Sequence, residues 1–426
     1  MSSPNRSLLN DHRSLLEDHD FSFVASSPVV SHSHHFNLGF DQIIDDALGP
    51  VHGPQVRAES AYESCSLLLN GFISELPPTT LEERVEIAAS MFASMGLGSL
   101  DFEIAADGSG TVIGRHMHYG YLWREQIGRV SERTRTDGGD AFAAEFIAAT
   151  VEAAFGMPTG SIQCSETACI AKGDGDECRF ELTPSKEDKE AFGVTRADIL
   201  EVVPESFGAL DEIQLTDIAG DLREFVVKAT NADQRGLIAS FGVYLTHHLA
   251  NYYNLCANRM FDILAVERPF ALDIARELLR DCGHRDGYFT FGGLLRSDEW
   301  KALSIEGSGP RQTIIGCLSI ARAFGYGHWS LESYEPDQRL VLRSPSTYES
   351  SYRKVAHQDG ETGCCFTYQG AAMSMMDLAH RVIPGKGPSL TASGYRRLRS
   401  GMPWKSSESH CVSAGHDMCR VIIERA

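Results

Sequence analysis

The chain has 426 residues, which is too long for one typical core and suits two domains of roughly 150–200 residues. Its net charge of −20 and the lack of a Lys/Arg stripe argue against nucleic acid as a partner, because DNA binding needs a basic face. No stretch approaches the roughly 20 apolar residues of a membrane helix, and the polar N-terminus holds no signal-peptide segment. We therefore expect a cytoplasmic protein that binds no membrane, with a disordered tail at residues 1–20.

Eleven cysteines are spread along the chain, an odd number in a protein without an export signal. Disulfide frameworks are typical of exported proteins, whereas cysteines of cytosolic chains are more often buried thiols or metal ligands. We therefore expect reduced cysteines, and their spacing indicates which of them are candidates for metal binding.

An internal repeat is the clearest pattern in the chain. The segment Phe36–Leu38 (Phe-Asn-Leu) returns as Tyr253–Leu255 (Tyr-Asn-Leu), 217 residues further on. The same separation places Cys65 on Cys282. A helix–loop–helix unit of about 30 residues is therefore repeated without a gap.

Downstream of this unit, the same elements follow in the same order in both copies. A helix with apolar residues at helical spacing ends on a Gly-x-Gly stop, at 96–98 in one copy and 325–327 in the other. Two strand-like runs, a second helix and a cysteine cluster come next. The predicted helices lie at 87–100, 141–155, 314–331 and 366–382, and the predicted strands at 100–105, 110–117, 329–334 and 339–344.

This matched order indicates a tandem duplication. We predict repeat 1 at residues 21–183, an acidic helical connector at 184–237 and repeat 2 at 238–426. Repeat 2 also carries an insertion at 384–405 that is rich in Gly, Pro and Ser, which is typical of a loop or lid. The predicted fold class is α/β (α+β), with an antiparallel sheet, packed helices and a C-terminal Cys/Glu hairpin in each repeat.

Each repeat ends in a cluster of one glutamate and two cysteines. The shared pattern is Glu, two residues, Cys, a glycine-containing turn and Cys-Arg. Such a turn brings two thiolates to one point, where a carboxylate can complete three corners of a tetrahedron, and Zn²⁺ suits this mixture of ligands. The alternative is that the cysteines are simply buried. The candidates are Glu408, Cys411 and Cys419 in repeat 2, and Glu166, Cys169 and Cys178 in repeat 1.

The repeat 2 cluster resembles that of the 4-vinyl reductase domain, a family that includes bacteriochlorophyll-biosynthesis proteins and the sensory domains of phenol- and xylene-responsive activators. In those sensors one Glu and three Cys bind a structural zinc beside an apolar ligand pocket. Glu408, Cys411 and Cys419 match that spacing. Cys365, which Gly370 follows five residues later, matches the remaining cysteine, although the insertion separates it from the cluster. The resemblance implies structural zinc in repeat 2 and a pocket for a small organic ligand.

Repeat 1 departs from this pattern. Its two cysteines lie one residue further apart, and the upstream cysteine is replaced by Ala141. Cys164, two residues before Glu166, is an alternative third thiol. The sequence therefore leaves open whether repeat 1 binds a metal.

Histidines gather in repeat 1, at His34 and His35 before the first helix and at His116 and His118 on a predicted strand. Residues two apart on a strand share a face, so the last two imidazoles could both point inward. Imidazoles suit iron, copper or catalytic zinc, which makes these four histidines the catalytic candidates if the chain is an enzyme. The alternative is that they are polar surface groups or satisfy nearby backbone groups.

Three aromatic residues follow the same predicted strand, namely Tyr119, Tyr121 and Trp123. Aromatic residues at such spacing either pack in the core or line a cavity. Because the family that the chain resembles encloses small organic ligands near this strand, the resemblance favours a cavity wall.

Two functions are compatible with these features. In the first, the chain binds a small, largely apolar or aromatic molecule, with structural zinc in repeat 2 and a second copy of itself as a homodimer partner. In the second, it is a metal-dependent oxidoreductase with iron or another transition metal on the repeat 1 histidines, and a tetrapyrrole is one substrate that the resemblance allows. No P-loop, dinucleotide fingerprint or His-Glu-x-x-His motif supports another class. The resemblance favours binding.

Overall fold

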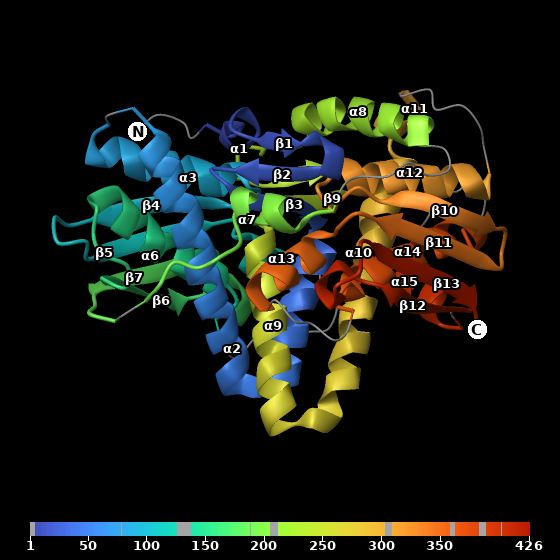
Figure 1. The fold of residues 1–426 in the computed structure, drawn as a ribbon. Coiled ribbons are helices and arrows are strands. Elements are labelled where there is room, and N and C mark those ends of the chain that lie inside the picture. The colour runs from blue at the N-terminus through green and yellow to red at the C-terminus, as the bar shows by residue number, and fades with distance from the viewer. Residues whose placement is uncertain are drawn as a thin grey trace.

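The computed structural model of the chain describes residues 5–77, 79–125, 138–187, 189–204, 212–302, 309–357, 363–382, 389–401 and 403–426. These residues form helices and three antiparallel sheets, which confirms the predicted α+β class. One sheet lies in each repeat, and the third lies between the repeats (Figure 1).

Each repeat contains a four-stranded sheet, and the two sheets have the same strand order, as a duplication requires. The order is β4-β5-β7-β6 in repeat 1 and β10-β11-β13-β12 in repeat 2. The last strand of each repeat is therefore an inner strand, and the cysteine cluster lies where that strand begins. The strands are β4 (Ser99–Ile104), β5 (Gly110–Arg115), β6 (Ile162–Ala168), β7 (Cys178–Pro184), β10 (Ser330–Glu335), β11 (Arg339–Ser344), β12 (Trp404–His410) and β13 (Cys419–Arg425).

The helix before each sheet is defined by its ends. Helix α3 (Leu81–Ser94) begins with a capping box at Thr80, and α12 (Pro310–Ala323) begins with a proline, whose missing N–H is not needed there. Both helices stop at the predicted glycines, where Gly96 and Gly325 adopt left-handed φ values of 83° and 85°.

The predicted helix–loop–helix unit is present in both repeats. In repeat 1 it is α2 (His34–Glu75), which is kinked at Gly49 just before a proline. In repeat 2 it is α9 (Ala250–Glu267) followed by α10 (Leu272–Arg296). The units pack against each other and project together from one side of the molecule (Figure 1).

The second predicted helices are α6 (Ala141–Phe155) and α14 (Phe366–His380), and each has 15 residues. Most of their residues are buried, as expected of helices that are apolar on nearly all sides. Helix α6 packs against α2, and α14 packs against α10.

The third sheet joins the two repeats and has the strand order β1-β2-β3-β9-β8. Repeat 1 and the segment before it supply β1 (Ser14–Leu16), β2 (Phe21–Val24) and β3 (Ser27–Ser33). Repeat 2 supplies β8 (Ile238–Ser240) and β9 (Val243–Leu249). Strands β3 and β9 pair antiparallel at the centre.

The two repeats interlock through these hairpins. The backbone N–H of Ser31 on β3 donates to Phe324 O of repeat 2 at 3.0 Å, and the N–H of His247 on β9 donates to Met95 O of repeat 1 at 2.9 Å. Each hairpin therefore bonds to the segment that ends the helix before the sheet in the other repeat. The chain forms a pseudo-twofold arrangement within itself.

The segment before repeat 1 differs from the disordered tail that the sequence predicts. Residues 8–11 form a short helix, α1 (Leu8–Asp11), and β1 follows it. The side chains of Leu8 and Leu9 are buried, so this segment has apolar anchors that its polar composition conceals. Residues 1–4 lie outside the described part of the chain.

The connector is helical, as predicted, with α7 (Arg196–Val202) and α8 (Glu212–Ala229). The described part of the repeat 2 insertion contains α15 (Ala392–Arg399). None of the described helices combines the length and the apolar character needed to cross a membrane. Short elements complete the fold: η1 (Glu17–His19), η4 (Pro269–Ala271) and α11 (Asp298–Ala302).

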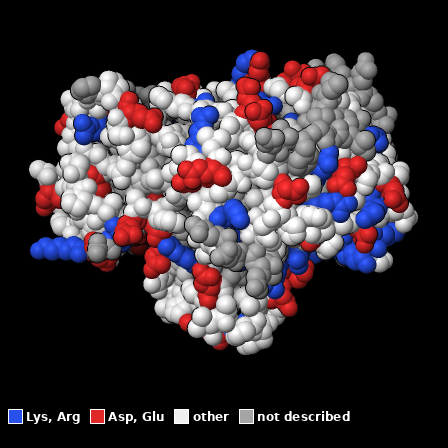
Figure 2. All heavy atoms as spheres, viewed as in Figure 1, with Lys and Arg blue, Asp and Glu red and all other residues white. Residues whose placement is uncertain are grey.

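The surface in view carries acidic and basic side chains in mixture (Figure 2). Basic residues are most numerous over the sheet of repeat 2, where several of them pair with carboxylates. Arg420 lies 2.6 Å from Glu332, and Arg339 lies 3.3 Å from Glu424. Such pairing leaves no continuous basic stripe on this face.

Candidate metal sites and ligand cavity

The structure brings together the four residues that the resemblance assigns to zinc in repeat 2. Cys365 caps the N-terminus of α14, and Glu408 lies on β12. Cys411 precedes the short helix η5 (Val412–Ala414), and Cys419 begins β13. One ligand atom from each of the four side chains lies within 4.8 Å of all the others.

The spacing of the sulfur atoms fits a tetrahedral zinc site. The Sγ atom of Cys365 lies 3.7 Å from that of Cys419 and 3.8 Å from that of Cys411, and the third edge measures 4.0 Å. Zn–S bonds of about 2.3 Å in a tetrahedron place sulfurs about 3.8 Å apart. The carboxylate atom Oε1 of Glu408 is buried and has no hydrogen-bond partner, so it is available as the fourth ligand. The residues present therefore fit the metal.

The electrostatics of this group also favour a cation. Burial, and then the Cys411 sulfur, raise the pKa of Glu408 far above its usual range. Burial likewise raises the pKa of the thiols of Cys365 and Cys419. Four acidic groups share a site from which water is excluded, and a divalent cation would favour their ionised forms.

A glycine that the sequence reasoning missed supports the carboxylate in each repeat. A Cβ atom at Gly363 would lie 2.1 Å from Glu408 Oε2, and one at Gly138 would lie 2.3 Å from Glu166 Oε2. Any larger residue at either position would push the carboxylate from the place it occupies. The available signal was a glycine two positions before the helix cap in both copies. Cys364 was also missed, and its Sγ lies 3.9 Å from that of Cys411.

Repeat 1 assembles a similar group of three. Ligand atoms of Glu166, Cys169 and Cys178 lie within 4.8 Å of one another. The turn between the cysteines contains η3 (Ile170–Lys172), and its first N–H donates to Cys178 Sγ at 3.5 Å. The first N–H of η5 donates to the second cysteine of repeat 2 at the same distance, so the extra residue in the repeat 1 turn leaves the start of the hairpin unchanged.

The upstream cysteine of repeat 2 corresponds to Asp140 in repeat 1, and the prediction of Ala141 was wrong by one residue. Asp140 caps α6 as Cys365 caps α14, and its N–H donates to Glu166 Oε2 at 3.2 Å. The N–H of Cys365 makes the equivalent bond at the same length. Cys164 is buried on β6 and does not belong to the group of three.

Burial and neighbouring acids shift the acidic groups of repeat 1. Burial, followed by the charge of Cys169, raises the pKa of Asp140 to about 8. Burial and then Asp140 raise the pKa of Glu166 to about 9. The hydrogen bond with Cys178 lowers the pKa of Cys169 to about 5. This group, like that of repeat 2, lacks a positive charge of its own.

The two histidines at the start of α2 have separate surroundings. His34 accepts the N–H of Tyr244 on Nδ1 at 3.2 Å, and burial lowers its pKa to about 4. His35 stacks on Phe289 with ring centroids 3.5 Å apart. The neutral imidazoles thus join the helix to β9 and α10.

The prediction that His116 and His118 share a strand face is wrong. Strand β5 ends at Arg115, His116 adopts a left-handed φ of 53°, and His118 begins helix α4 (His118–Trp123). His118 is buried and accepts from Asn37 on Nε2 at 2.9 Å, whereas His116 is partly exposed. Among the described residues, no histidine belongs to a group of three metal-ligating side chains. The structure therefore does not gather the four histidines into the predicted catalytic metal site.

The predicted aromatic cavity wall lies on α4. The Tyr119 hydroxyl is buried and lies 3.0 Å from Nε2 of His248 on β9, and Trp123 packs in the core. Tyr121 packs against the core from the rim. None of the three lines the cavity between the repeats, so α4 serves as a contact between repeat 1 and the central sheet.

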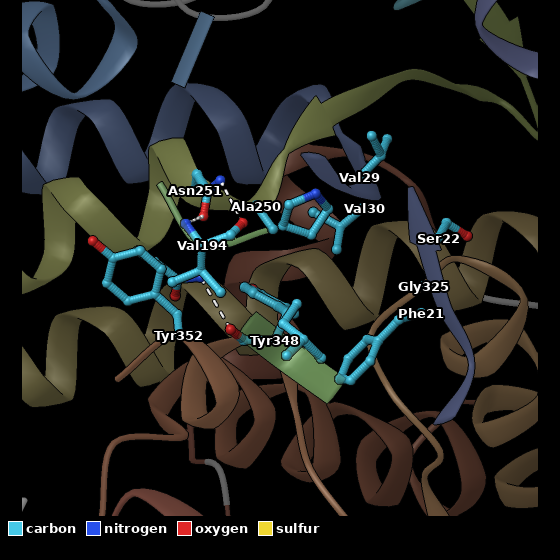
Figure 3. A pocket seen from close by; sticks show the side chains of 13 residues that line it. Phe21, Ser22, Val29, Val30, Val194, Ala250, Asn251, Gly325, Tyr348 and Tyr352 are labelled. Atoms are coloured by element: carbon cyan, nitrogen blue, oxygen red, sulfur yellow. Dashed lines mark hydrogen bonds between the residues drawn. The ribbon is translucent and has the colours of Figure 1, made fainter. Parts of the chain in front are cut away.

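A small apolar cavity lies where the two repeats and the connector meet (Figure 3). Its free volume is about 10 Å³, which is roughly the space that one water molecule needs. Tyr348 and Tyr352, from helix α13 (Tyr348–His357), form one side. The other lining residues are Phe21, Ser22, Pro28, Val29, Val30, Val194, Ile199, Ala250, Asn251, Asn254 and Gly325.

A larger and more open pocket of about 390 Å³ lies between β1 and α8. Arg13, Arg223 and Lys228 are among its lining residues. Arg13 donates to Ser22 Oγ at 2.7 Å, and burial together with Arg223 lowers its pKa to about 10. Glu224 also lines this pocket, and Arg223 pairs with Asp20 at 2.8 Å, so the pocket is polar and of mixed charge, in contrast to the apolar cavity.

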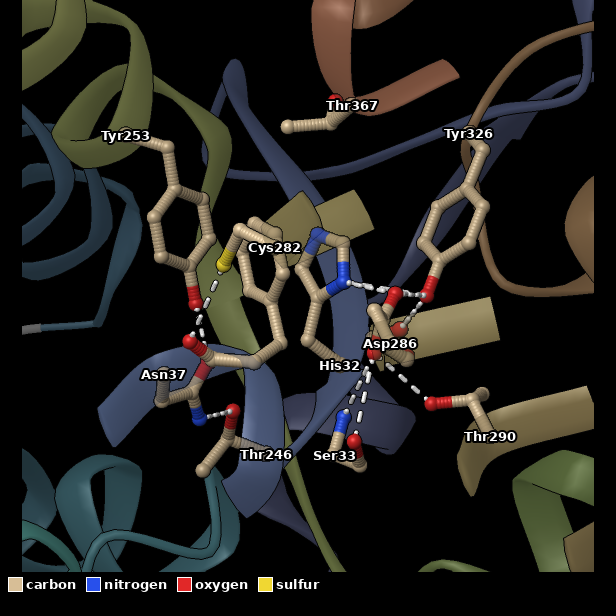
Figure 4. A network of polar contacts seen from close by, with 12 residues as sticks. His32, Ser33, Asn37, Thr246, Tyr253, Cys282, Asp286, Thr290, Tyr326 and Thr367 are labelled. Carbon is tan, nitrogen blue, oxygen red and sulfur yellow. Dashed lines mark hydrogen bonds and ion pairs between the residues drawn. The ribbon is translucent and has the colours of Figure 1, made fainter. Parts of the chain in front are cut away.

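A buried polar network joins the repeats beside the cavity (Figure 4). The Asp286 carboxylate on α10 accepts from His32 Nδ1 at 2.8 Å and from the hydroxyls of Thr290 and Tyr326 at 2.8 and 3.0 Å. His32 stacks between Tyr326 and Phe36, with centroids 4.8 and 4.0 Å away. Sequence reasoning missed Asp286 because its partners come from β3, α10 and the segment after α12.

Comparisons with known proteins add a structural likeness. No family model matches the chain, and no curated protein matches it. Among solved structures, the chain is similar to the phenol-responsive sensory domain of the transcription activator PoxR with phenol, with 15% sequence identity and a TM-score of 0.34. That likeness covers 42% of this chain and 88% of the sensory domain.

Proposed function

We propose that this chain is a small-molecule-binding module in which two 4-vinyl-reductase-like repeats form one interlocked unit, with a structural zinc in repeat 2. The observation that carries the proposal is the four-ligand group of Cys365, Glu408, Cys411 and Cys419. A site with four protein ligands has no open corner for chemistry, so its role is structural.

The zinc ligands connect elements that support the interface between the repeats. Cys365 belongs to α14, and the other three ligands belong to the β12–β13 hairpin. Helix α14 packs closely on α10, because a Cβ at Gly370 would lie 2.0 Å from Arg280 O. Helix α10 carries Asp286 of the polar network. Zinc would therefore stabilise the pair of helices α10 and α14, of which α10 packs against β3.

The cavity between the repeats is the proposed ligand site, because its walls are apolar and come from both repeats and from the connector. The connector closes it, since the Asn251 side chain exchanges two hydrogen bonds with the Val194 backbone, at 3.0 and 3.1 Å. Because the free volume is only about 10 Å³, a small aromatic molecule would fit only if this segment moved away and the cavity widened. The predicted ligand is therefore small and largely apolar.

Elemental analysis of the purified, reduced chain tests the metal. We expect zinc in the wild type and the loss of one equivalent in Cys411→Ser. Protein that is free of metal while its thiols are intact would contradict the zinc proposal without bearing on the ligand.

Thermal unfolding with added phenol or dimethylphenol tests the ligand. The Tm should rise for the wild type and for Ala239→Leu, an exposed control on β8, but not for Ala250→Leu, which fills the cavity. An unchanged rise in Ala250→Leu, with its loss in Arg13→Met, would move the site to the polar pocket between β1 and α8 and overturn the cavity assignment. No rise at millimolar phenol in any variant would refute the ligand class.

A further inference from the structure

The two Glu/Cys groups share a backbone arrangement and differ at the helix cap and at the residue before it, where repeat 2 has Cys364 and repeat 1 has Gly139. Each has a glycine beside the carboxylate, a helix cap whose N–H bonds that carboxylate at 3.2 Å, and a turn whose N–H bonds the second cysteine at 3.5 Å. At the helix cap, repeat 2 has Cys365 and repeat 1 has Asp140. This position thus holds a thiol, a soft metal ligand, in repeat 2 and a carboxylate, a hard metal ligand, in repeat 1.

One oxygen of the Asp140 carboxyl is left without a hydrogen-bond partner. Burial raises the pKa of this carboxyl and the backbone N–H groups of Gly120 and Ala143 lower it in part, but no regular cap bond to the first turn is made. The side chain is 1% exposed, and its Oδ2 is buried without a hydrogen-bond partner. Glu166 Oε1 is buried and unpartnered as well.

The unpaired oxygen faces the same place as the cysteines. A Cβ atom at Gly120 on α4 would lie 3.2 Å from Cys178 Sγ and 3.8 Å from Asp140 Oδ2, so both atoms surround one point below that helix. Asp140 is not part of the group of Glu166, Cys169 and Cys178 whose ligand atoms are within 4.8 Å of one another, but its N–H bonds Glu166 Oε2 at 3.2 Å, and burial, followed by the charge of Cys169, raises its pKa. To become a ligand, the carboxylate would have to turn toward that group.

We propose that repeat 1 binds a second divalent cation through Asp140, Glu166, Cys169 and Cys178, and that it exchanges this cation far more readily than repeat 2. The proposal extends the metal-binding part of the proposed function and does not depend on the small-molecule ligand. Thiolates hold Zn²⁺ and Co²⁺ more tightly than carboxylates do, and repeat 1 offers two thiolates where repeat 2 offers three. Binding and release of the cation would form or break no covalent bond within the protein.

The position of the site gives this exchange a route to the interface between the repeats. Gly120 lies directly above Cys178, and its neighbour Tyr119 reaches His248 on β9. Trp123 lies on the same short helix and is 7% exposed.

Titration of the metal-free, reduced full chain with Co²⁺ tests the proposal. The sulfur-to-cobalt charge-transfer absorption grows with the number of thiolate ligands, so the two sites differ in intensity. We expect two equivalents per chain in the wild type, of which one is removed by a brief exposure to a chelator. Asp140→Asn should weaken the second equivalent at least about tenfold, the loss that even an outer-shell partner of a metal site can cause. Asp140→Cys should make both equivalents resistant to the chelator.

Matched variants separate the two sites and keep the test decisive. Cys169→Ser should abolish only the exchangeable equivalent, Cys411→Ser only the resistant one, and Cys365→Asp should make repeat 2 exchangeable. If Asp140→Asn binds the second equivalent as the wild type does, Asp140 is not a ligand and the proposal fails. If the wild type binds one equivalent that Cys169→Ser does not affect, the repeat 1 site does not exist. Loss of the resistant equivalent alone would contradict the repeat 2 zinc and leave this proposal standing.

Discussion

Repeat 1 and repeat 2 have the same backbone arrangement at the Glu/Cys group and different side chains at the helix cap. The glycine, the helix cap and the turn are common to both, whereas Asp140 stands where repeat 2 has Cys365. The shared parts bury the glutamate and close the hairpin in both repeats. The side chain at the helix cap is the part that differs between them.

The central sheet shows a second divergence at equivalent positions. His32 and His248 each follow the residue whose N–H crosses to the other repeat. His32 meets the Asp286 carboxyl group, and His248 meets the Tyr119 hydroxyl. The pseudo-twofold arrangement is therefore symmetric in its backbone and asymmetric in the polar partners of its buried histidines.

The largest expected effect comes from removing one thiol in each repeat. Cys411→Ser should lower the free energy of unfolding by several kcal/mol, because the structural metal is lost, whereas Cys169→Ser should cost much less. Denaturant unfolding with and without a chelator measures both. Equal losses in the two variants would show that the repeats hold metal in the same way.

Removing Asp286 should be the next largest effect, since the buried donors of His32, Thr290 and Tyr326 lose their shared acceptor. We expect Asp286→Ala to cost about 3–5 kcal/mol, because each buried group left unsatisfied costs about 1–3 kcal/mol. The counterpart in the other half, Tyr119→Phe, should cost about 1–2 kcal/mol, because it removes a hydrogen bond between neutral groups. Urea denaturation of the two variants tests the comparison, and a larger cost for Tyr119→Phe would reverse it.

Alanine substitutions at Gly363 and Gly138 test whether both carboxylates need the space beside these glycines. Gly363→Ala should displace Glu408, lower the affinity of repeat 2 for metal and cost about 1–3 kcal/mol. Gly138→Ala should act in the same way on repeat 1. The control is Gly220→Ala on α8, where an added Cβ meets nothing within 4 Å. Metal stoichiometry and Tm together measure the effect, and unchanged values for Gly363→Ala would contradict it.

The smallest expected effect is on the pH dependence of stability. It concerns the residue five positions after each helix cap, which is Glu145 in repeat 1 and Gly370 in repeat 2. Burial raises the pKa of Glu145 to about 7. The folded state then holds a proton that the unfolded state releases, so stability falls as pH rises from about 4.5 through 7 and is constant above that range. Glu145→Gln should reduce this fall by on the order of 2 kcal/mol. Unfolding measured at a series of pH values checks it, and parallel curves for the two proteins would contradict the shift.

The sequence alone indicated the repeat, the order of helices and strands and the residues of both Glu/Cys groups. These features are local, since periodicity, glycine stops and a short Glu-x-x-Cys spacing act within a few turns of chain. Cys365 came from the resemblance, because the insertion separates it from the rest of its group.

Only the tertiary structure revealed the exchange of hairpins, the pairing of His32 with Asp286 and the place of Asp140. Each of these depends on segments that are distant in the chain, and several packings of the same elements satisfy the same local pattern. The strand predicted at 110–117 was too long for the same reason. His116 adopts a left-handed φ and β5 ends before it, so the side chains beyond Arg115 do not continue the alternation of the strand. Local chemistry therefore determined which groups this protein carries, and long-range packing decided which of them meet.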